Sequence, residues 1–146
     1  MRGENYISIE FPSRSCNEAL ARGVIACFAA QLDPTMDELG DIKTAVSEAV
    51  TNCIVHAYPD DVGPILLKAR ILDENVLDIV VKDRGCGIAD VDQASKPMFT
   101  TGGEERSGMG ITIMESFMSE FRISSTLGKG TSVHMKRKIV RRGGKK

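Results

Sequence analysis

Five stretches of the chain are rich in β-branched residues or alternate between apolar and polar positions, a pattern typical of strands. They are residues 6–11, 65–72, 76–83, 121–126 and 131–139. Asp73-Glu74-Asn75 separates the second stretch from the third, and Gly128-Lys129-Gly130 separates the fourth from the fifth. Short polar or glycine-rich connections of this kind predict two hairpins.

Apolar residues recur at helical spacing after Ser15, where we expect the first helix. Ser15 and Glu18 stand three residues apart and predict a capping box at its start. Arg22 lies off the apolar stripe, so we expect its side chain to face solvent. The stripe itself is expected to contain Leu20, Val24, Cys27, Phe28 and Gln31.

A second helix is expected to begin at Asp33-Pro34, because an N-cap residue followed by proline is a typical helix start. It continues to about Tyr58, where a proline and two aspartates follow. A third helix is expected to start near Gly110 and to run through Met118. Residues 88–107 show little periodicity and many small or polar side chains, which is typical of a functional or mobile loop.

The element order β-α-α-β-β-loop-α-β-β predicts an α+β fold, a two-layer α/β sandwich. We expect a mixed, mainly antiparallel sheet with the helices on one face. A chain of 146 residues is long enough for one domain with its own core and too short for two. We therefore expect a single domain over residues 1–140 and a basic, flexible tail over residues 141–146.

Charge is unevenly distributed along the chain, although the net charge is only −1. The last eleven residues contain seven basic side chains and no acidic one, which leaves 12 basic and 20 acidic residues elsewhere. An acidic body argues against direct nucleic-acid binding, because phosphate contacts need clustered Lys and Arg. No apolar run reaches the length of a membrane span, and four unpatterned cysteines without an export signal favour a reducing cytoplasm.

Glu48, Asn52 and His56 stand four residues apart, which places them on one face of the second helix. Polar groups in such a row are costly to bury without a purpose. Glu48 could act as a base toward a hydroxyl or water, and Asn52 offers a neutral oxygen to Mg²⁺. Alternatively, Glu48 and Asn52 form a polar pair at the helix edge whose hydrogen bonds are satisfied. His56, near the helix end, is more typical of a capping or structural residue.

Two glycine-containing motifs follow the row. Asp83-Arg84-Gly85-Cys86-Gly87 ends a strand, where the carboxylate could accept a hydrogen bond from an exocyclic amine such as that of adenine. Gly108-Met109-Gly110 opens the third helix, whose free N–H groups suit phosphate, and Arg106 and Ser107 could reach the same anion. A tight turn and a flexible hinge are the respective alternatives. Neither a P-loop nor a Rossmann fingerprint is present.

In this order the motifs resemble the ATPase and kinase superfamily that includes gyrase B, Hsp90, histidine kinases and MutL. Residues 48–52 resemble its N box, residues 83–87 and 108–110 its glycine boxes, and Gly130-Thr131 its later Gly-Thr pair. A closer resemblance, to the sporulation anti-sigma F factors, covers about residues 6–139. It rests on residues 32–39, 47–52, 97–101 and 105–110.

The resemblance implies a Bergerat-type ATP-binding fold that uses ATP or ADP with Mg²⁺. It implies a protein serine kinase that holds a sigma factor inactive, phosphorylates a serine of an anti-anti-sigma protein, and forms a homodimer. The first strand is a plausible edge for the dimer, and Arg22 is a candidate partner contact. A general-stress anti-sigma kinase of the same family and a nucleotide-gated binding module without transfer remain alternatives.

The resemblance also implies roles for single residues. Glu48 would be the general base, Asn52 would hold Mg²⁺ through phosphates and water, and Asp83 would bind the adenine amine. Cys53 and Ala57 depart from the family, where Ala and Gly are expected. The other implied nucleotide contacts are Gly85, Gly87, Thr100, Thr101, Arg106 (toward the γ-phosphate), Ser107, Gly108, Met109, Gly110 and Thr131.

Overall fold

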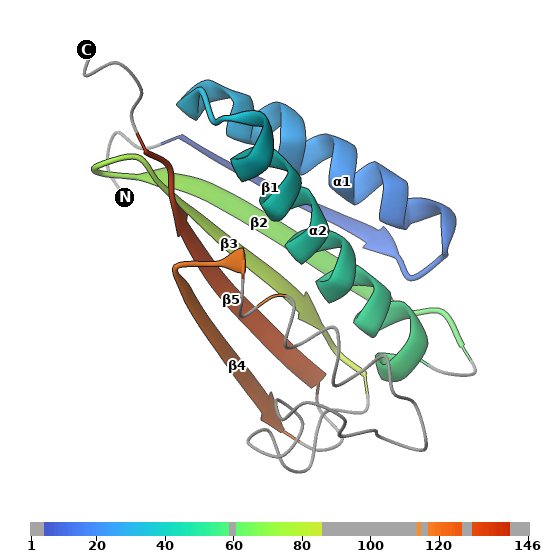
Figure 1. Cartoon of the computed structure of the whole chain (residues 1–146). Helices are drawn as coiled ribbons and strands as arrows, with labels where there is room; N and C mark the ends of the chain where they lie inside the picture. Colours follow the sequence, from blue (N-terminus) through green and yellow to red (C-terminus); the bar gives the residue numbers. More distant parts are fainter. Residues whose placement is uncertain (1–4, 59–60, 86–113, 115–116, 127–129, 141–146) are drawn as a thin grey trace.

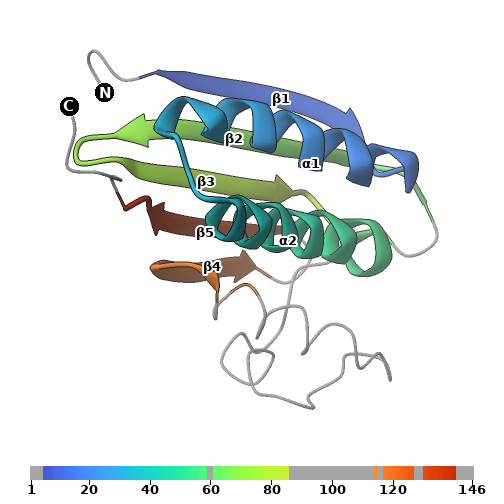
Figure 2. The same ribbon diagram turned by 45° about the horizontal axis from the view of Figure 1, so that its top comes forward.

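The computed structural model describes residues 5–58, 61–85, 114, 117–126 and 130–140. Its elements are β1 (Tyr6–Pro12), α1 (Cys16–Ala29), the short 3-10 turn η1 (Ala30–Leu32), α2 (Met36–Asn52), the π-helical turn η2 (Cys53–Ala57), β2 (Pro64–Leu72), β3 (Val76–Asp83), β4 (Glu120–Thr126) and β5 (Gly130–Lys138). The described strands form one sheet in the order β1-β2-β3-β5-β4, and each neighbouring pair is antiparallel. Both long helices cover the same face of this sheet (Figures 1 and 2). The predicted two-layer α+β fold is confirmed.

Both expected hairpins are present in the sheet. β2 pairs with β3 from Ile65 opposite Asp83 to Leu72 opposite Val76. Between them Glu74 has a positive φ of 65°, which helps the chain to reverse. β4 pairs with β5, and β5 in turn pairs with β3, so the strand that is last in sequence lies inside the sheet.

The start of the second helix differs from the prediction. α2 begins at Met36, and its N-cap is Thr35, whose side chain accepts a hydrogen bond from the N–H of Glu38 while Glu38 accepts one from Thr35. Asp33 instead has a left-handed backbone with a φ of 54°. The helix start at Asp33-Pro34 was therefore wrong by two residues, because the reciprocal Thr35 and Glu38 pair satisfies the free N–H groups better.

The capping box predicted at Ser15 is also wrong. Ser15 precedes α1 with a helical backbone, and its side chain makes no capping hydrogen bond. Glu18, the expected partner, accepts a hydrogen bond from the hydroxyl of Ser47 on α2 and lies 3.3 Å from Nε of Arg22. A tertiary contact between the two helices has replaced the local cap.

The apolar stripe of α1 is only partly as predicted. Phe28 is buried, but Leu20 is 48% exposed and Cys27 is also exposed. The inward positions are instead Ala21 and Ile25, which have no exposed surface. Successive positions of a helix point in different directions, so Leu20, next to the buried Ala21, lies outside the core.

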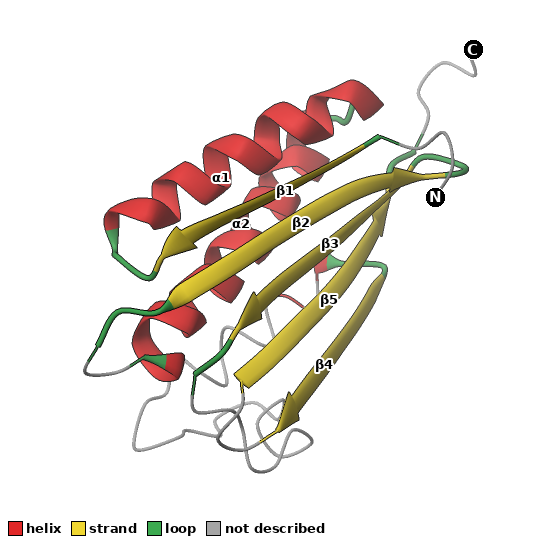
Figure 3. Cartoon of the chain, turned by 180° about the vertical axis from the view of Figure 1, so that it is seen from behind, coloured by secondary structure: helices red, strands yellow, loops and turns green. Residues whose placement is uncertain are grey.

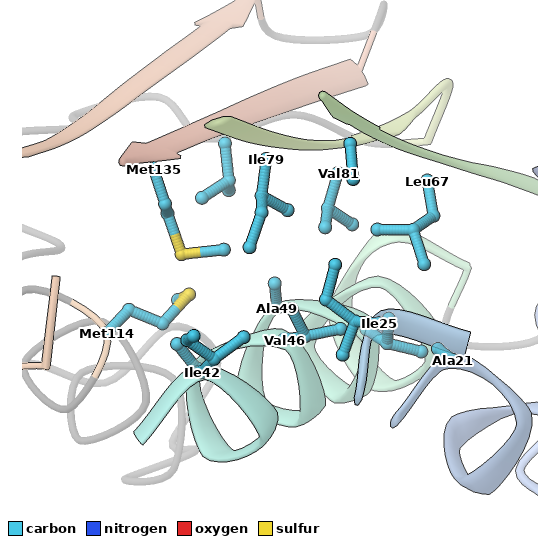
Figure 4. Close-up of a cluster of buried hydrophobic side chains, with 14 of the residues drawn as sticks. Ala21, Ile25, Ile42, Val46, Ala49, Leu67, Ile79, Val81, Met114 and Met135 are labelled. Carbon is cyan, nitrogen blue, oxygen red and sulfur yellow. The ribbon is translucent and has the colours of Figure 1, made fainter. Parts of the chain in front are cut away.

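The core lies between the helices and the sheet, as Figure 4 shows. Ile42 and Val46 of α2 are fully buried and project toward the sheet. Met114 and Met118 also contribute to the core, whereas most of the predicted third helix and the predicted loop at 88–107 lie outside the described residues. The sheet contributes Leu67, Ile79, Val81 and Met135.

The second helix continues in helical form almost to Tyr58, as expected, but its last turn is a π-helix. Wider turns of this kind are frequent at functional sites. Within the part of the chain that the structure describes, no helix is long and apolar enough to cross a membrane.

The sheet face that the helices leave uncovered is visible in Figure 3. Asp78 of β3 is only 2% exposed, and its Oδ2 lies 2.6 Å from Nε of Arg70. Its other oxygen contacts Nε2 of His134. A cation therefore compensates the buried carboxylate.

Candidate nucleotide site

Three chain segments meet at one end of the molecule: η2 after α2, the end of β3, and the start of β5 (Figure 1). At their junction lies Asp83, the last residue of β3, whose side chain is buried. Its Oδ1 accepts hydrogen bonds from the N–H groups of Gly85 at 2.9 Å and Thr131 at 3.2 Å. Its Oδ2 accepts one from the thiol of Cys53, at a sulfur–oxygen distance of 3.4 Å.

Asp83 can accept at least one more hydrogen bond than the three just described. An ionised carboxylate oxygen can accept two hydrogen bonds, so the two backbone donors saturate Oδ1. Oδ2 has one weak sulfur donor and can accept a second, stronger one. A buried acceptor in this state suits a ligand that offers an N–H group.

Two glycines allow the backbone segments to approach this closely. A Cβ atom on Gly85 would lie 2.2 Å from the carbonyl oxygen of Ala57, so no side chain fits there. Gly130 has a φ of 122°, and its Cβ would lie 2.2 Å from the carbonyl oxygen of Asp83. The turn after β3 is thus packed directly against η2 and β5.

The hydroxyl of Tyr58 also holds the turn after β3 in place. Its hydroxyl accepts a hydrogen bond from the N–H of Arg84 at 2.7 Å and donates one to the carbonyl of Pro64 at 2.8 Å. Burial raises the pKa of Tyr58, and the charge of Asp83 raises it further against the opposing hydrogen bond from Arg84. The phenol therefore stays protonated and keeps both hydrogen bonds at neutral pH.

Glu48 and Asn52 lie one turn apart on α2, and both are half-buried. Asn52 is the last residue of α2 and directly precedes Cys53, the residue that contacts Asp83. The predicted row thus leads along the helix toward the buried carboxylate. His56 belongs to the π-turn, so the regular α-helical spacing does not extend to it, and its structural role stays a prediction.

The described residues contain no group of three or more His, Cys, Asp or Glu side chains that could hold a metal ion. Mg²⁺ usually takes one or two protein oxygens and completes its ligand set with phosphate and water, and the neutral oxygen of Asn52 fits such a set.

Several predicted contacts lie outside the described residues, and their roles stay predictions. They are Gly87, Thr100, Thr101, Arg106, Ser107, Gly108, Met109 and Gly110. Of the other candidates, Thr131 contacts Asp83 by its backbone N–H, which donates a hydrogen bond to the carboxylate. The hydroxyl of Thr131 lies 2.9 Å from that of Ser125. Arg22 has a side chain that is 43% exposed, as expected for a surface residue.

Sequence patterns did not identify Cys53 and Tyr58 as members of this site. Cys53 is buried, and its thiol donates a hydrogen bond to Asp83. The departure from the family residue at this position was the available signal. Tyr58 offered no signal beyond its place at the helix end, because its partners are backbone groups.

Comparisons with known proteins show the family of the chain. Residues 11–137 match the family described as the histidine kinase-like ATPase domain. The anti-sigma F factor of Caldanaerobacter subterraneus subsp. tengcongensis is 55% identical over 142 residues, which cover 97% of this chain and 99% of that protein. The anti-sigma F factor of Geobacillus thermodenitrificans is 49% identical over 138 residues, with 94% of each chain covered.

A solved structure supports the fold. The RsbU and RsbW domains of Rv1364c from Mycobacterium tuberculosis superpose with a TM-score of 0.68 at 21% identity. The match covers 94% of this chain and 32% of the larger one. The chain belongs to the histidine kinase-like ATPase domain family and, within it, to the anti-sigma F factors.

Proposed function

We propose that the chain is an ATP-dependent protein serine kinase that inhibits a sporulation sigma factor and phosphorylates its anti-anti-sigma partner on a serine. The observation that carries the kinase part is the buried Asp83 carboxylate, fixed by backbone donors and by Cys53, which directly follows Asn52 at the end of the helix that bears Glu48. The partner assignment draws on the relatives named anti-sigma F factor at 49–55% identity.

Adenine recognition is assigned to Asp83. The exocyclic amine of adenine donates to Oδ2, the oxygen with spare acceptor capacity. Asn52 holds Mg²⁺ together with phosphate oxygens and water, and the ion, when bound, neutralises charge that develops on the phosphates.

Phosphoryl transfer is assigned to Glu48 as general base. The hydroxyl oxygen of the partner serine forms a bond to the γ-phosphorus of ATP, while the bond from that phosphorus to the bridging oxygen breaks and ADP leaves. The hydroxyl proton passes to the Glu48 carboxylate. Because Glu48 is only half-buried, an incoming side chain can reach it.

Replacement of Glu48 by Gln tests the base assignment. The variant keeps the size of the side chain, so ATP affinity is expected to remain, while transfer to the partner serine falls roughly 100-fold or more. Labelled ATP, Mg²⁺ and the purified anti-anti-sigma protein give the transfer rate, and nucleotide titration gives the affinity.

Glu74→Gln is the matched control, because Glu74 is 81% exposed in the hairpin between β2 and β3. Near-normal transfer by Glu48→Gln would exclude the base role. If the wild-type protein retains a sigma factor but transfers no phosphate, the chain is a nucleotide-gated binding module. Parallel capture assays with the sporulation and the general-stress sigma factors, with and without ATP, decide between the two anti-sigma alternatives.

We assign the homodimer surface to the edge of the sheet at β1. β1 pairs only with β2 among the described strands, so its other side is free to pair with a second copy. Beside it runs an apolar groove, which contains Ile7 of β1 and Leu20 and Val24 of α1. A two-fold axis perpendicular to the sheet at this edge would pair the two β1 strands antiparallel and bring the two grooves together on one face.

A further inference from the structure

We propose that Cys53 is a positioning residue that holds Oδ2 of Asp83 in the orientation that accepts the 6-amino group of adenine. This inference rests on the proposed kinase function and deepens it. It gives the residue after Asn52 a part in base recognition, where the family is expected to have an alanine that can make no such hydrogen bond.

The geometry ties the thiol to the carboxylate directly. Cys53 is 4% exposed and Asp83 6% exposed, so water does not compete for the hydrogen bond between them. The contact joins residues that are 30 positions apart, at a sulfur–oxygen distance of 3.4 Å. Because Oδ1 is bonded to Gly85 and Thr131, the thiol is the third point that fixes the plane of the carboxylate.

The thiol acts as a donor under ordinary conditions. The hydrogen bond runs from the sulfur of Cys53 to Oδ2 of Asp83, so the thiol is the donor and the carboxylate is the acceptor. As a weak donor it orients Oδ2 while leaving that oxygen able to accept a stronger N–H donor.

The π-turn explains how the thiol reaches this place. Cys53 opens η2, the turn in which the regular α-helix widens, and Ala57 closes it. The carbonyl of Ala57 lies against Gly85, so both ends of η2 touch the turn that carries Asp83. The wider turn therefore supports the carboxylate at one end and the backbone beside it at the other.

This arrangement predicts an effect that depends on the base. An ionised carboxylate only accepts hydrogen bonds, so it favours a purine with an amine at position 6. If the thiol orients Oδ2 for that amine, removal of the thiol should lower the affinity for nucleotides that carry the amine. The affinity for a purine nucleotide with hydrogen at position 6 should not change.

The experiment compares Cys53→Ala with the wild type for binding of ATP and of purine riboside triphosphate, which lacks the 6-amino group. We expect Cys53→Ala to lower the affinity for ATP about tenfold and to leave the affinity for purine riboside triphosphate unchanged. Cys53→Ser restores a donor and should recover most of the ATP affinity. Cys16→Ala, which removes an exposed thiol outside the groove beside β1, should leave both affinities unchanged.

An equal loss for both nucleotides in Cys53→Ala would show that the thiol only fills space, and an unchanged ATP affinity would show that it does not orient Asp83. Either result overturns the inference and leaves the kinase proposal intact. If the wild-type protein binds neither nucleotide, the proposed function itself fails and takes the inference with it.

Discussion

β3 carries two buried aspartates, Asp78 and Asp83, on opposite faces of the sheet. Their contacts distinguish a side chain with a structural role from one that is a candidate to bind a ligand. Asp78 is buried against Arg70 and His134, so a cation offsets its charge. The hydrogen bonds described for Asp83 come only from neutral donors, a thiol and two backbone amides. Its Oδ2 therefore keeps the capacity to accept a further hydrogen bond from a ligand.

Asp83→Asn should weaken ATP binding roughly 100-fold, because the amide nitrogen would offer a donor where the adenine amine needs an acceptor. Asp78→Asn is the matched control on the same strand, and its ATP affinity should stay at the wild-type value. Isothermal titration measures both, and circular dichroism verifies that each variant is folded. Equal losses in the two variants would contradict the assignment of the amine to Asp83.

The sequence indicated single residues as candidates for the site, but it did not indicate which groups lie beside them. Asp83 could be predicted because a strand end followed by glycines is a local pattern. The hydrogen bond from Cys53 could not, since it depends on how a helix end and a strand end approach each other across 30 positions. The second donor, Thr131, is 48 positions away and uses its backbone, which side-chain patterns do not reveal.

At the scale of the elements, strands were predicted more accurately than helix ends. The hairpin of β2 and β3 follows from two β-rich runs and one polar turn, all of them local signals. The start of α2 depended on a choice between two competing local signals, Asp33-Pro34 and the pair Thr35 and Glu38. The second pair prevails because each of its members satisfies a backbone N–H group of the other.

Glu38 also links the start of α2 to the end of the sheet. Its Oε2 accepts a hydrogen bond from the N–H of Val140, just beyond β5. Burial raises the pKa of Glu38, but hydrogen bonds from Thr35 and Val140 and the charge of Arg137 together outweigh that effect and lower it. A carboxylate with a lowered pKa stabilises the folded state above its unfolded pKa and loses this contribution as the pH falls through the folded value.

Glu38→Gln should therefore lower the free energy of unfolding by about 1 kcal/mol at pH 7. The difference from wild type should shrink once the pH falls below the ordinary glutamate value of 4.5. Urea unfolding at several pH values measures it, with Glu74→Gln as the exposed control. A difference that is the same at pH 7 and well below pH 4 would contradict the role of the ionised carboxylate.

At the scale of the whole molecule, the exposed apolar residues of α1 indicate a surface that a second copy could cover. Leu20, Val24 and Cys27 belong to the expected apolar stripe, and in the structure they line the groove beside β1. Their pattern is that of a helix with two apolar faces, one of which Ala21 and Ile25 direct into the core. The periodicity could reveal apolar positions but could not say which of the two faces the chain itself covers.

Leu20→Glu should shift the protein from dimer to monomer, because it places a charge in the groove that the second copy would cover. Sedimentation velocity at several concentrations measures the shift. Met36→Glu is the matched control, since Met36 is 84% exposed at the start of α2, away from this edge. If both variants sediment like the wild type, the dimer uses another surface or does not form.

The position of β5 has a consequence for biosynthesis. A ribosome produces β1, β2 and β3 first, and these three can already pair in the order of their synthesis. β4 emerges next, but in the described sheet it is joined to β3 only through β5, which is made last. The nascent chain therefore carries an open edge on β3 until β5 is made, and the backbone turn that completes the Asp83 cluster is added only with β5.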